Sequence, residues 1–447
     1  MKYRQDQLKL PGVPRAKQGR EVAPKWAWTE GSVWTERMLA TLETGVKGGK
    51  WFSLMDKVWK MENLQSAVKT VARKKGAAGV DGKQVERYLL ESPQRLLKVS
   101  TWLKTGAYTP KPVKRVWIEK LGSKELRPLG VPTVEDRVTE TAIRNVIEPI
   151  FENIFAEHSY GFRPGRGAKD ALRRVDQLLK AGKVWVVDAD LKGYFDSIPQ
   201  DKLMEAVAEH IADGPLLDLI QRFLKQGVME SGKDWQPMET GTPQGAVISP
   251  LLANIYLNPL DHLMARAGQE MVRYADDFVV MCESQTEAVA VLERLRQWVE
   301  QAGLRLHPIK TRIVDASQRG GFDFLGYHFE RTFKWPREKS LEKFRETIRQ
   351  KSRRVRSGSM QQIINEVNRS LKGWFEYFKH STIWTFIRLD KWVRGRLRTI
   401  NRKRDKKQGR ARGKDHQRWP NAYFTRLGLI SLALAARNAS RPPLRGH

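Results

Sequence analysis

Apolar residues recur at helical spacing along most of this chain and at strand spacing in a few short segments. Helical periodicity predicts helices over residues 62–75, 84–104, 135–155, 202–210, 216–226 and 248–267. Strand-like runs occupy 113–118 and 183–190, and residues 271–282 are apolar on both sides of an acidic centre, which predicts a hairpin. Strands that alternate with longer helices predict an α+β fold for this part of the chain.

The pattern changes after residue 329, where the strand-like segments stop. Three further helical patterns predict a separate all-α module, over residues 341–356, 360–380 and 384–400. Residues 401–418 are expected to form a low-complexity basic loop. Residues 1–50 show no periodicity, so we expect an extended or loosely docked arm there.

Charge is distributed very unevenly along the chain. Residues 331–447 hold 32 Lys and Arg against 8 Asp and Glu, a net charge of +24, whereas residues 51–330 hold 39 against 37, a net +2. Such a concentration of positive charge repels itself unless a polyanion binds it, so we expect nucleic acid as the partner. A membrane surface is disfavoured because no amphipathic or lipidated anchor is found. The single cysteine, Cys282, excludes a disulfide framework and indicates a reducing compartment.

Carboxylates follow strand-like sequence at two places. Asp188 and Asp190 end one apolar run, and Asp276 and Asp277 interrupt the predicted hairpin. Alternation along a strand places Asp188 and Asp190 on one face, whereas Asp276 and Asp277 need a tight turn to point the same way. Acids in apolar surroundings are costly unless a cation lies between them, which favours a Mg²⁺ site. Spacing alone leaves an ordinary acidic turn as the alternative, and does not choose between Asp188 and Asp190.

Several motifs in this chain resemble those of reverse transcriptases. Residues 274–277, Tyr-Ala-Asp-Asp, resemble their Tyr-X-Asp-Asp box, and residues 190–196, Asp-Leu-Lys-Gly-Tyr-Phe-Asp, resemble their first metal-binding strand. Further matches in the same order lie at residues 127–137, 159–165, 241–254, 310–311 and 324–327. Together these motifs resemble the reverse transcriptase/maturase proteins encoded by bacterial group II introns, from about residue 55 to residue 398.

The resemblance implies a right-hand polymerase fold. Fingers and palm would occupy residues 51–330, and a helical thumb that doubles as the maturase domain would occupy 334–400. A basic arm (1–50) and a basic DNA- or RNA-binding region (401–447) would flank them. Two Mg²⁺ ions would be held by the catalytic carboxylates and one neighbouring residue, namely Asp190, Asp276, Asp277 and Leu191.

The resemblance also implies nucleotide and nucleic-acid contacts. Phe195 would pack under the incoming sugar and exclude a ribose 2′-hydroxyl, Lys120 and Arg127 would clamp the triphosphate, and Gln244 would lie near the templating base pair. Lys310 would contact the primer backbone. The other residues expected to bind nucleic acid are Arg163, Arg394, Arg396, Arg398, Arg402, Lys403 and Arg404. The aromatic residues of 364–378 are expected to be core.

The implied partners are group II intron RNA, target DNA with a primer strand, and dNTPs, with no membrane. The protein would act as a monomer or homodimer in the bacterial cytoplasm, near the nucleoid. Residues 441–447 lack the His-Asn-His and cysteine cluster in which many relatives end, so no endonuclease is expected and the primer would come from elsewhere. A splicing-only RNA-binding protein and a domesticated reverse transcriptase in defence or repair stay open as alternatives.

Overall fold

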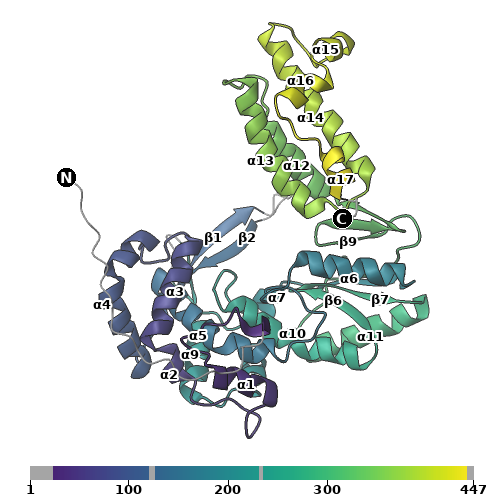
Figure 1. Ribbon diagram of the computed structural model, residues 1–447. Coiled ribbons are helices and arrows are strands. Elements are labelled where there is room, and N and C mark those ends of the chain that lie inside the picture. Colours follow the sequence, from purple (N-terminus) through teal and green to yellow (C-terminus); the bar gives the residue numbers. More distant parts are fainter. Residues whose placement is uncertain (1–23, 120–125, 231–234, 440–447) are drawn as a thin grey trace, which may run out of the picture.

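The computed structural model describes residues 24–119, 126–230 and 235–439. An α+β body carries a helical module on one side, and the two are joined through a small sheet (Figure 1). The predicted α+β fold with a helical C-terminal module is confirmed.

A four-stranded antiparallel sheet, with strand order β6-β7-β3-β8, forms the centre of the α+β body. Its strands are β3 (Trp185–Asp190), β6 (Glu270–Tyr274), β7 (Asp277–Cys282) and β8 (Arg312–Asp315). One face packs on α6 (Ala168–Lys180) and the other on α10 (Ser249–Arg266) and α11 (Gln285–Gln301). Figure 1 shows α6 and α11 on opposite sides of this central sheet.

A second four-stranded sheet, order β2-β1-β4-β5, lies on the other side of the α+β body. It contains the hairpin β1 (Val113–Glu119) and β2 (Leu126–Val131), with β4 (Val228–Glu230) and β5 (Trp235–Gln236). The helices of this region are α2 (Met55–Val58), α3 (Met61–Lys74), α4 (Val85–Lys104), α5 (Val134–Glu152), α7 (Tyr194–Ser197), α8 (Gln200–Ala208) and α9 (Gly214–Lys225). Helix α5 is capped by Thr133, the residue before its first turn, whose hydroxyl accepts the Asp136 backbone N–H.

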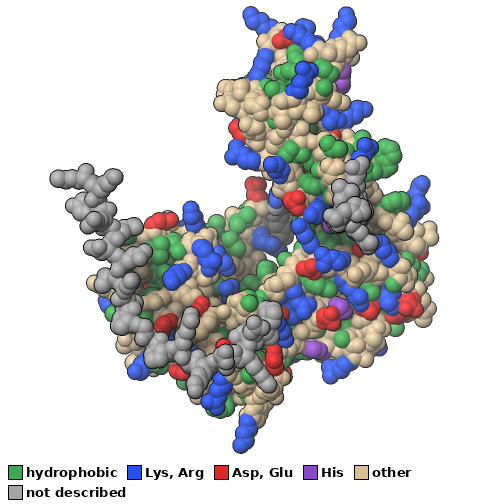
Figure 2. Space-filling model, viewed as in Figure 1, with side chains coloured by type: hydrophobic (Ala, Val, Ile, Leu, Met, Phe, Trp, Pro, Cys, Tyr) green, Lys and Arg blue, Asp and Glu red, His purple; other side chains and the backbone are tan. Residues whose placement is uncertain are grey.

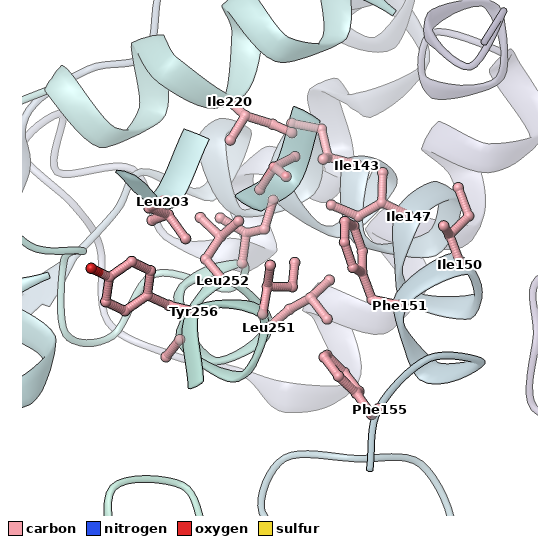
Figure 3. Packing of buried hydrophobic residues seen from close by; sticks show 14 of the residues in the cluster. Ile143, Ile147, Ile150, Phe151, Phe155, Leu203, Ile220, Leu251, Leu252 and Tyr256 are labelled. Carbon is pink, nitrogen blue, oxygen red and sulfur yellow. The ribbon is translucent and has the colours of Figure 1, made fainter. Parts of the chain in front are cut away.

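The largest hydrophobic core lies between α5 and α10. Figure 3 shows Ile147 and Phe151 of α5 facing Leu251 and Leu252 of α10, with Leu203 of α8 close by. Burial of these large apolar side chains fixes α5 against α10, and α10 in turn supports the central sheet.

The N-terminal region differs from the loosely docked arm that we expected. The structure places η1 (Pro24–Trp26) and α1 (Glu36–Thr44) against the main core, where Trp26 and Trp34 are 1% and 2% exposed. The Trp34 indole N–H donates to the Asn145 backbone carbonyl over 2.9 Å. Two tryptophans bury enough apolar area to dock a segment that has no periodic pattern. Residues 1–23 of the predicted arm lie outside the described residues.

The prediction that strands stop after Phe329 is wrong. A three-stranded sheet contains β9 (Phe322–Phe324), β10 (Tyr327–Glu330) and β11 (Phe333–Pro336). Its last strand was missed because Lys334 and Trp335 break the simple alternation of polar and apolar residues. The buried tyrosine Tyr327 on β10 donates its hydroxyl to the Tyr377 carbonyl and thereby links this sheet to the helical module.

The helical module has a hydrophobic core of its own. It contains α12 (Glu338–Lys351), α13 (Met360–Phe378), α14 (Ile383–Arg404), α15 (Gly413–Arg418), α16 (Asn421–Arg426) and α17 (Leu432–Ala439). Phe375 and Phe378 are buried, as predicted for the aromatic residues of 364–378. The basic loop expected over 401–418 is partly helical, because α14 runs on to Arg404 and α15 follows. None of the helices in the described ranges contains an apolar stretch that could span a lipid bilayer.

Candidate active site

The carboxylates predicted from the sequence meet where β3 and β7 pair. Asp190 lies directly opposite Asp277 in the antiparallel register, and Asp188 lies on the same face of β3 as Asp190. Tyr274 pairs with Asp277, so the hairpin turns through Ala275 and Asp276. Ala275 has a φ of 61°, a left-handed conformation that is uncommon for a residue other than glycine. The tight turn that the sequence required is therefore present, with Asp276 at its tip.

Burial makes this group of acids difficult to ionise. It raises the pKa of Asp188 to about 6 and that of Asp277 to about 7, and neighbouring carboxylates add to the shift of Asp277. Burial also raises the pKa of Asp276, and Asp190 contributes to that shift. Such mutual repulsion between buried acids is relieved by a cation bound among them.

Two basic side chains partly compensate the acids. Lys310 Nζ lies 2.6 Å from Asp190 Oδ2, and Arg312 Nε lies 3.4 Å from Asp188 Oδ2. Carboxylate oxygens are the donors that Mg²⁺ prefers, so the donor set fits such an ion. Within the described ranges, however, no three Asp, Glu, His or Cys side chains are arranged to ligate one ion. Lys310 pairs with Asp190, which was predicted to bind metal, and the Lys310 side chain is 61% exposed to solvent.

The turn that carries Asp276 rests on a buried polar network that the sequence did not reveal. Arg273 is fully buried, and its guanidinium pairs with Asp261, with an Nε–Oδ1 distance of 2.7 Å. Its Nη1 donates to Asn254 Oδ1 and to the Ala275 carbonyl over 2.9 and 3.0 Å. A charged residue inside the apolar run 271–274 was the only signal for this network. The network fixes the backbone immediately before Asp276.

The motif at residues 159–165 packs against the same turn. Arg273 N–H donates to the His158 carbonyl, and Tyr160 N–H donates to the Arg273 carbonyl. A Cβ added to Gly161 would lie 2.3 Å from the Ala275 backbone nitrogen. Asn254 Nδ2 also donates to the Gly161 carbonyl over 2.7 Å. Glycine is therefore required here for the close approach of two backbones.

A cavity of about 690 Å³ opens beside Asp276, and most of the residues predicted to bind the nucleotide line it. We call it the nucleotide cavity. Asp276, Phe195, Gln244 and Arg127 all line it. Lys120, the other predicted phosphate contact, lies outside the described residues. The sequence interpretation missed the residues at the basic end of this cavity, which are Lys74, Lys75, Arg137 and Arg144. The Lys74-Lys75 pair before the turn of 76–82 was an available signal.

Two of the arginines predicted to bind nucleic acid instead hold the fold together. Arg163 is 6% exposed; its Nε and Nη2 donate to Glu152, and its Nη1 donates to two backbone carbonyls. Arg398 is 3% exposed and donates to the Trp419 carbonyl and to Asn421 Oδ1. A charge count along the sequence does not distinguish such buried arginines from exposed ones.

The other predicted basic contacts differ in their accessibility. Lys403 and Arg404 are exposed near the end of α14. Arg394 and Arg402 are half-buried, and Arg402 donates to Asp415 over 2.8 Å. Arg396 donates to the Ser352 hydroxyl over 2.7 Å and is also half-buried. These residues lie on the helical module, away from the acidic hairpin, as Figure 1 shows for α14.

A second cavity of about 490 Å³ lies in the helical module, between α12, α14 and the segment before α15. Within the described part of the chain, its lining contains Trp392, no carboxylate and five basic residues, namely Arg349, Arg354, Arg396, Arg410 and His416. Figure 2 shows further Lys and Arg side chains over this module. Arg349 pairs with Glu346 outside the lining, and the remaining cations beside an aromatic ring suit a nucleic-acid strand.

Residues 114–329 match the family described as reverse transcriptase (RNA-dependent DNA polymerase), and residues 341–419 match the group II intron, maturase-specific domain. Residues 114–329, which include the central sheet and the acidic hairpin, thus form a reverse transcriptase domain.

Individual relatives extend this result. Protein YkfC of Escherichia coli (strain K12) is 33% identical over 339 residues, which cover 66% of this chain and 87% of YkfC. The chain belongs to the family of group II intron reverse transcriptases and maturases. Group II intron-encoded protein LtrA of Lactococcus lactis subsp. cremoris is 42% identical over 184 residues, 41% of this chain but only 30% of LtrA. A Candida albicans telomerase structure matches with 13% identity and a TM-score of 0.41, covering 69% of this chain and 64% of that chain.

Proposed function

We propose that this protein is an RNA-directed DNA polymerase that binds structured group II intron RNA, assists its splicing and copies it during retrohoming. The observation that carries the polymerase proposal is the meeting of Asp190, Asp276 and Asp277 at the end of two paired strands. Asp276 also lines one cavity with Phe195 and Gln244, which supports a nucleotide site beside the carboxylates.

Each residue would contribute a defined part of the chemistry. Two Mg²⁺ ions would be held by Asp190, Asp276, Asp277 and the neighbouring residue Leu191. When bound, these ions supply Lewis acidity for in-line phosphoryl transfer. Arg127 would form paired hydrogen bonds to the triphosphate, and Lys120 would add a point charge. Phe195 would exclude the 2′-hydroxyl of an NTP. Lys310 would leave Asp190 and bind the primer backbone.

The test of the polymerase proposal is primer extension on an RNA template with Mg²⁺, comparing dNTPs with NTPs. We expect extension with dNTPs, little with NTPs, and none after chelation of Mg²⁺. A folded protein that binds intron RNA but extends no primer would contradict the polymerase proposal and favour the splicing-only alternative. Copying of unrelated RNA with no effect on intron splicing would favour the domesticated alternative.

The helical module would bind the intron RNA, with the target DNA and primer strand in the body below. The basic cavity beside Trp392 and the exposed Lys403 and Arg404 support this assignment. RNA of this kind is held mainly through its backbone, so affinity depends on released counterions.

We therefore expect the double variant Lys403→Gln, Arg410→Gln to bind intron RNA more weakly and with a flatter salt dependence. The slope of log K against log salt concentration is negative, and each lost phosphate contact lowers its magnitude by about 0.7 to 0.9. Filter binding between low and moderate salt measures this slope. The matched control, Lys47→Gln with Lys50→Gln, removes the same charge from exposed lysines outside the helical module. Equal slopes for the two double variants would rule out this RNA surface.

A further inference from the structure

Helix α5 carries a fully buried acid, Glu140, that the proposed chemistry does not use. Burial raises its pKa to about 8. Its Oε1 atom has no hydrogen-bond partner within the described part of the chain. A buried carboxyl with an unsatisfied oxygen costs stability, so its presence calls for a compensating role.

Among the described residues, the other carboxyl oxygen accepts one hydrogen bond, from the loop that carries Gln244. Glu140 Oε2 accepts the Val247 backbone N–H over 2.8 Å, at a separation of 107 residues along the chain. Residues 241–248 form this loop, which we name the Gln244 loop. Glu140 thus ties α5, in the main core, to a segment that borders the nucleotide cavity.

The Gln244 loop is also held at its start and its middle. Gly241 N–H donates to the Ile198 carbonyl over 2.7 Å, and Thr242 N–H donates to the Phe195 carbonyl over 2.7 Å. In the middle, Gly130 N–H of β2 donates to the Gln244 carbonyl over 2.6 Å. The bond from Val247 to Glu140 is the anchor at the end of the loop.

These contacts leave the loop little freedom as long as all the anchors hold. A Cβ added to Gly245 would lie 2.3 Å from the Gly130 carbonyl oxygen, so loop and β2 are in backbone contact. Loss of the Val247 anchor would let Gln244 shift relative to Phe195 and Asp276, which line the same cavity. A displacement of about 1 Å in such a site lowers rates on the order of a hundredfold.

We propose that Glu140 is a positioning residue that fixes the Gln244 loop against the incoming nucleotide and so sets nucleotide affinity and accuracy. This role rests on the proposed polymerase function. Glu140 is not among the residues that line the cavity, and would act through its hydrogen bond with the Val247 N–H. Gln at this position would keep an acceptor for that N–H, whereas Leu would not.

The test compares Glu140→Leu with Glu140→Gln in primer extension on RNA. For Glu140→Leu we expect about a tenfold higher KM for the dNTP, a smaller change in kcat and more misincorporation. The melting temperature should stay within a few degrees of the wild-type value for two reasons. The substitution removes the cost of the buried acid, and Val247 lines the cavity, where water can accept its N–H. Glu140→Gln should restore the wild-type KM and accuracy.

Hydrogen–deuterium exchange gives a readout that does not depend on polymerase activity. Glu140→Leu should speed exchange in the Gln244 loop, whereas Glu140→Gln should not. The matched control is Thr139→Val, which removes a buried hydroxyl bonded within α5 and leaves the loop untouched. Unchanged exchange and unchanged KM in Glu140→Leu would overturn the positioning role. Absence of extension by the wild type would overturn the proposed polymerase function alone, since exchange would still test Glu140.

Discussion

Replacing Asp276 by Asn is expected to lower DNA synthesis by about a thousandfold, because one well-placed group of this kind is worth on the order of 10²–10³ in rate. The amide keeps the shape of the turn but loses the charge that binds a divalent cation. Primer extension with dNTPs on RNA measures the loss. Folding should not suffer, since burial and Asp190 already raise the pKa of Asp276 and oppose its charge.

Asp188 supplies the matched control for this prediction. It lies on the same face of the central sheet as Asp190, but Arg312 faces it and it is not expected to bind metal. Asp188→Asn should keep most of the polymerase activity. Equal losses in the two variants would show that the whole acidic face acts together, and would contradict the assignment of Asp190, Asp276 and Asp277 as the catalytic group.

Replacing Gly161 by Ala is expected to have the second-largest effect. The new methyl group would lie 2.3 Å from the Ala275 nitrogen and 2.9 Å from the Tyr274 carbonyl carbon. These are backbone atoms, so relief requires movement of the turn that carries Asp276. We expect activity to fall about a hundredfold from the misplacement, and the free energy of unfolding to fall by about 1–3 kcal/mol from overpacking.

Primer extension and thermal or urea unfolding measure the two effects of Gly161→Ala. Gly167→Ala is the matched control, because a Cβ there meets only Asp170 Oδ2 at 3.9 Å and the backbone is extended. Its effect on stability should be about 1 kcal/mol or less, since Ala is a poorer N-cap residue than Gly, and its activity should stay near that of the wild type. Full activity in Gly161→Ala would contradict this prediction. It would show that the turn can shift despite its buried contacts without loss of function.

Much of the fold could be predicted from periodicity because long amphipathic helices carry a strong signal. The helix expected over 84–104 is α4 (Val85–Lys104), and the one expected over 248–267 is α10 (Ser249–Arg266). The acidic hairpin could be predicted for a different reason. Acids inside an apolar run have few stable arrangements, and a tight turn with its carboxylates at the tip is one of them.

The parts of the fold and site that periodicity did not predict depend on contacts between residues that are not neighbours in the sequence. Trp34 docks through its hydrogen bond to Asn145, and Arg163 is buried because it pairs with Glu152. Neither pair produces a periodic pattern in the sequence. The support of the Asp276 turn by Arg273 and Asp261 was missed for the same reason. Glu140 was missed because a single acid on a helix usually faces solvent. Assignments of nucleic-acid contacts from charge alone fail where an arginine has an internal partner.

The division of the hydrophobic packing into three clusters affects how this protein can change over evolutionary time. The core around α5 and α10 shares no residue with the core of the helical module, and Tyr327 and Tyr377 bond across the junction between them. A third cluster joins the central sheet to Phe378 of α13, so only that end of α13 is tied to the packing behind the acidic hairpin. Substitutions on the exposed surface of the module away from this end can accumulate without disturbing that packing. One lineage could therefore adapt to a new RNA while its chemistry stayed intact.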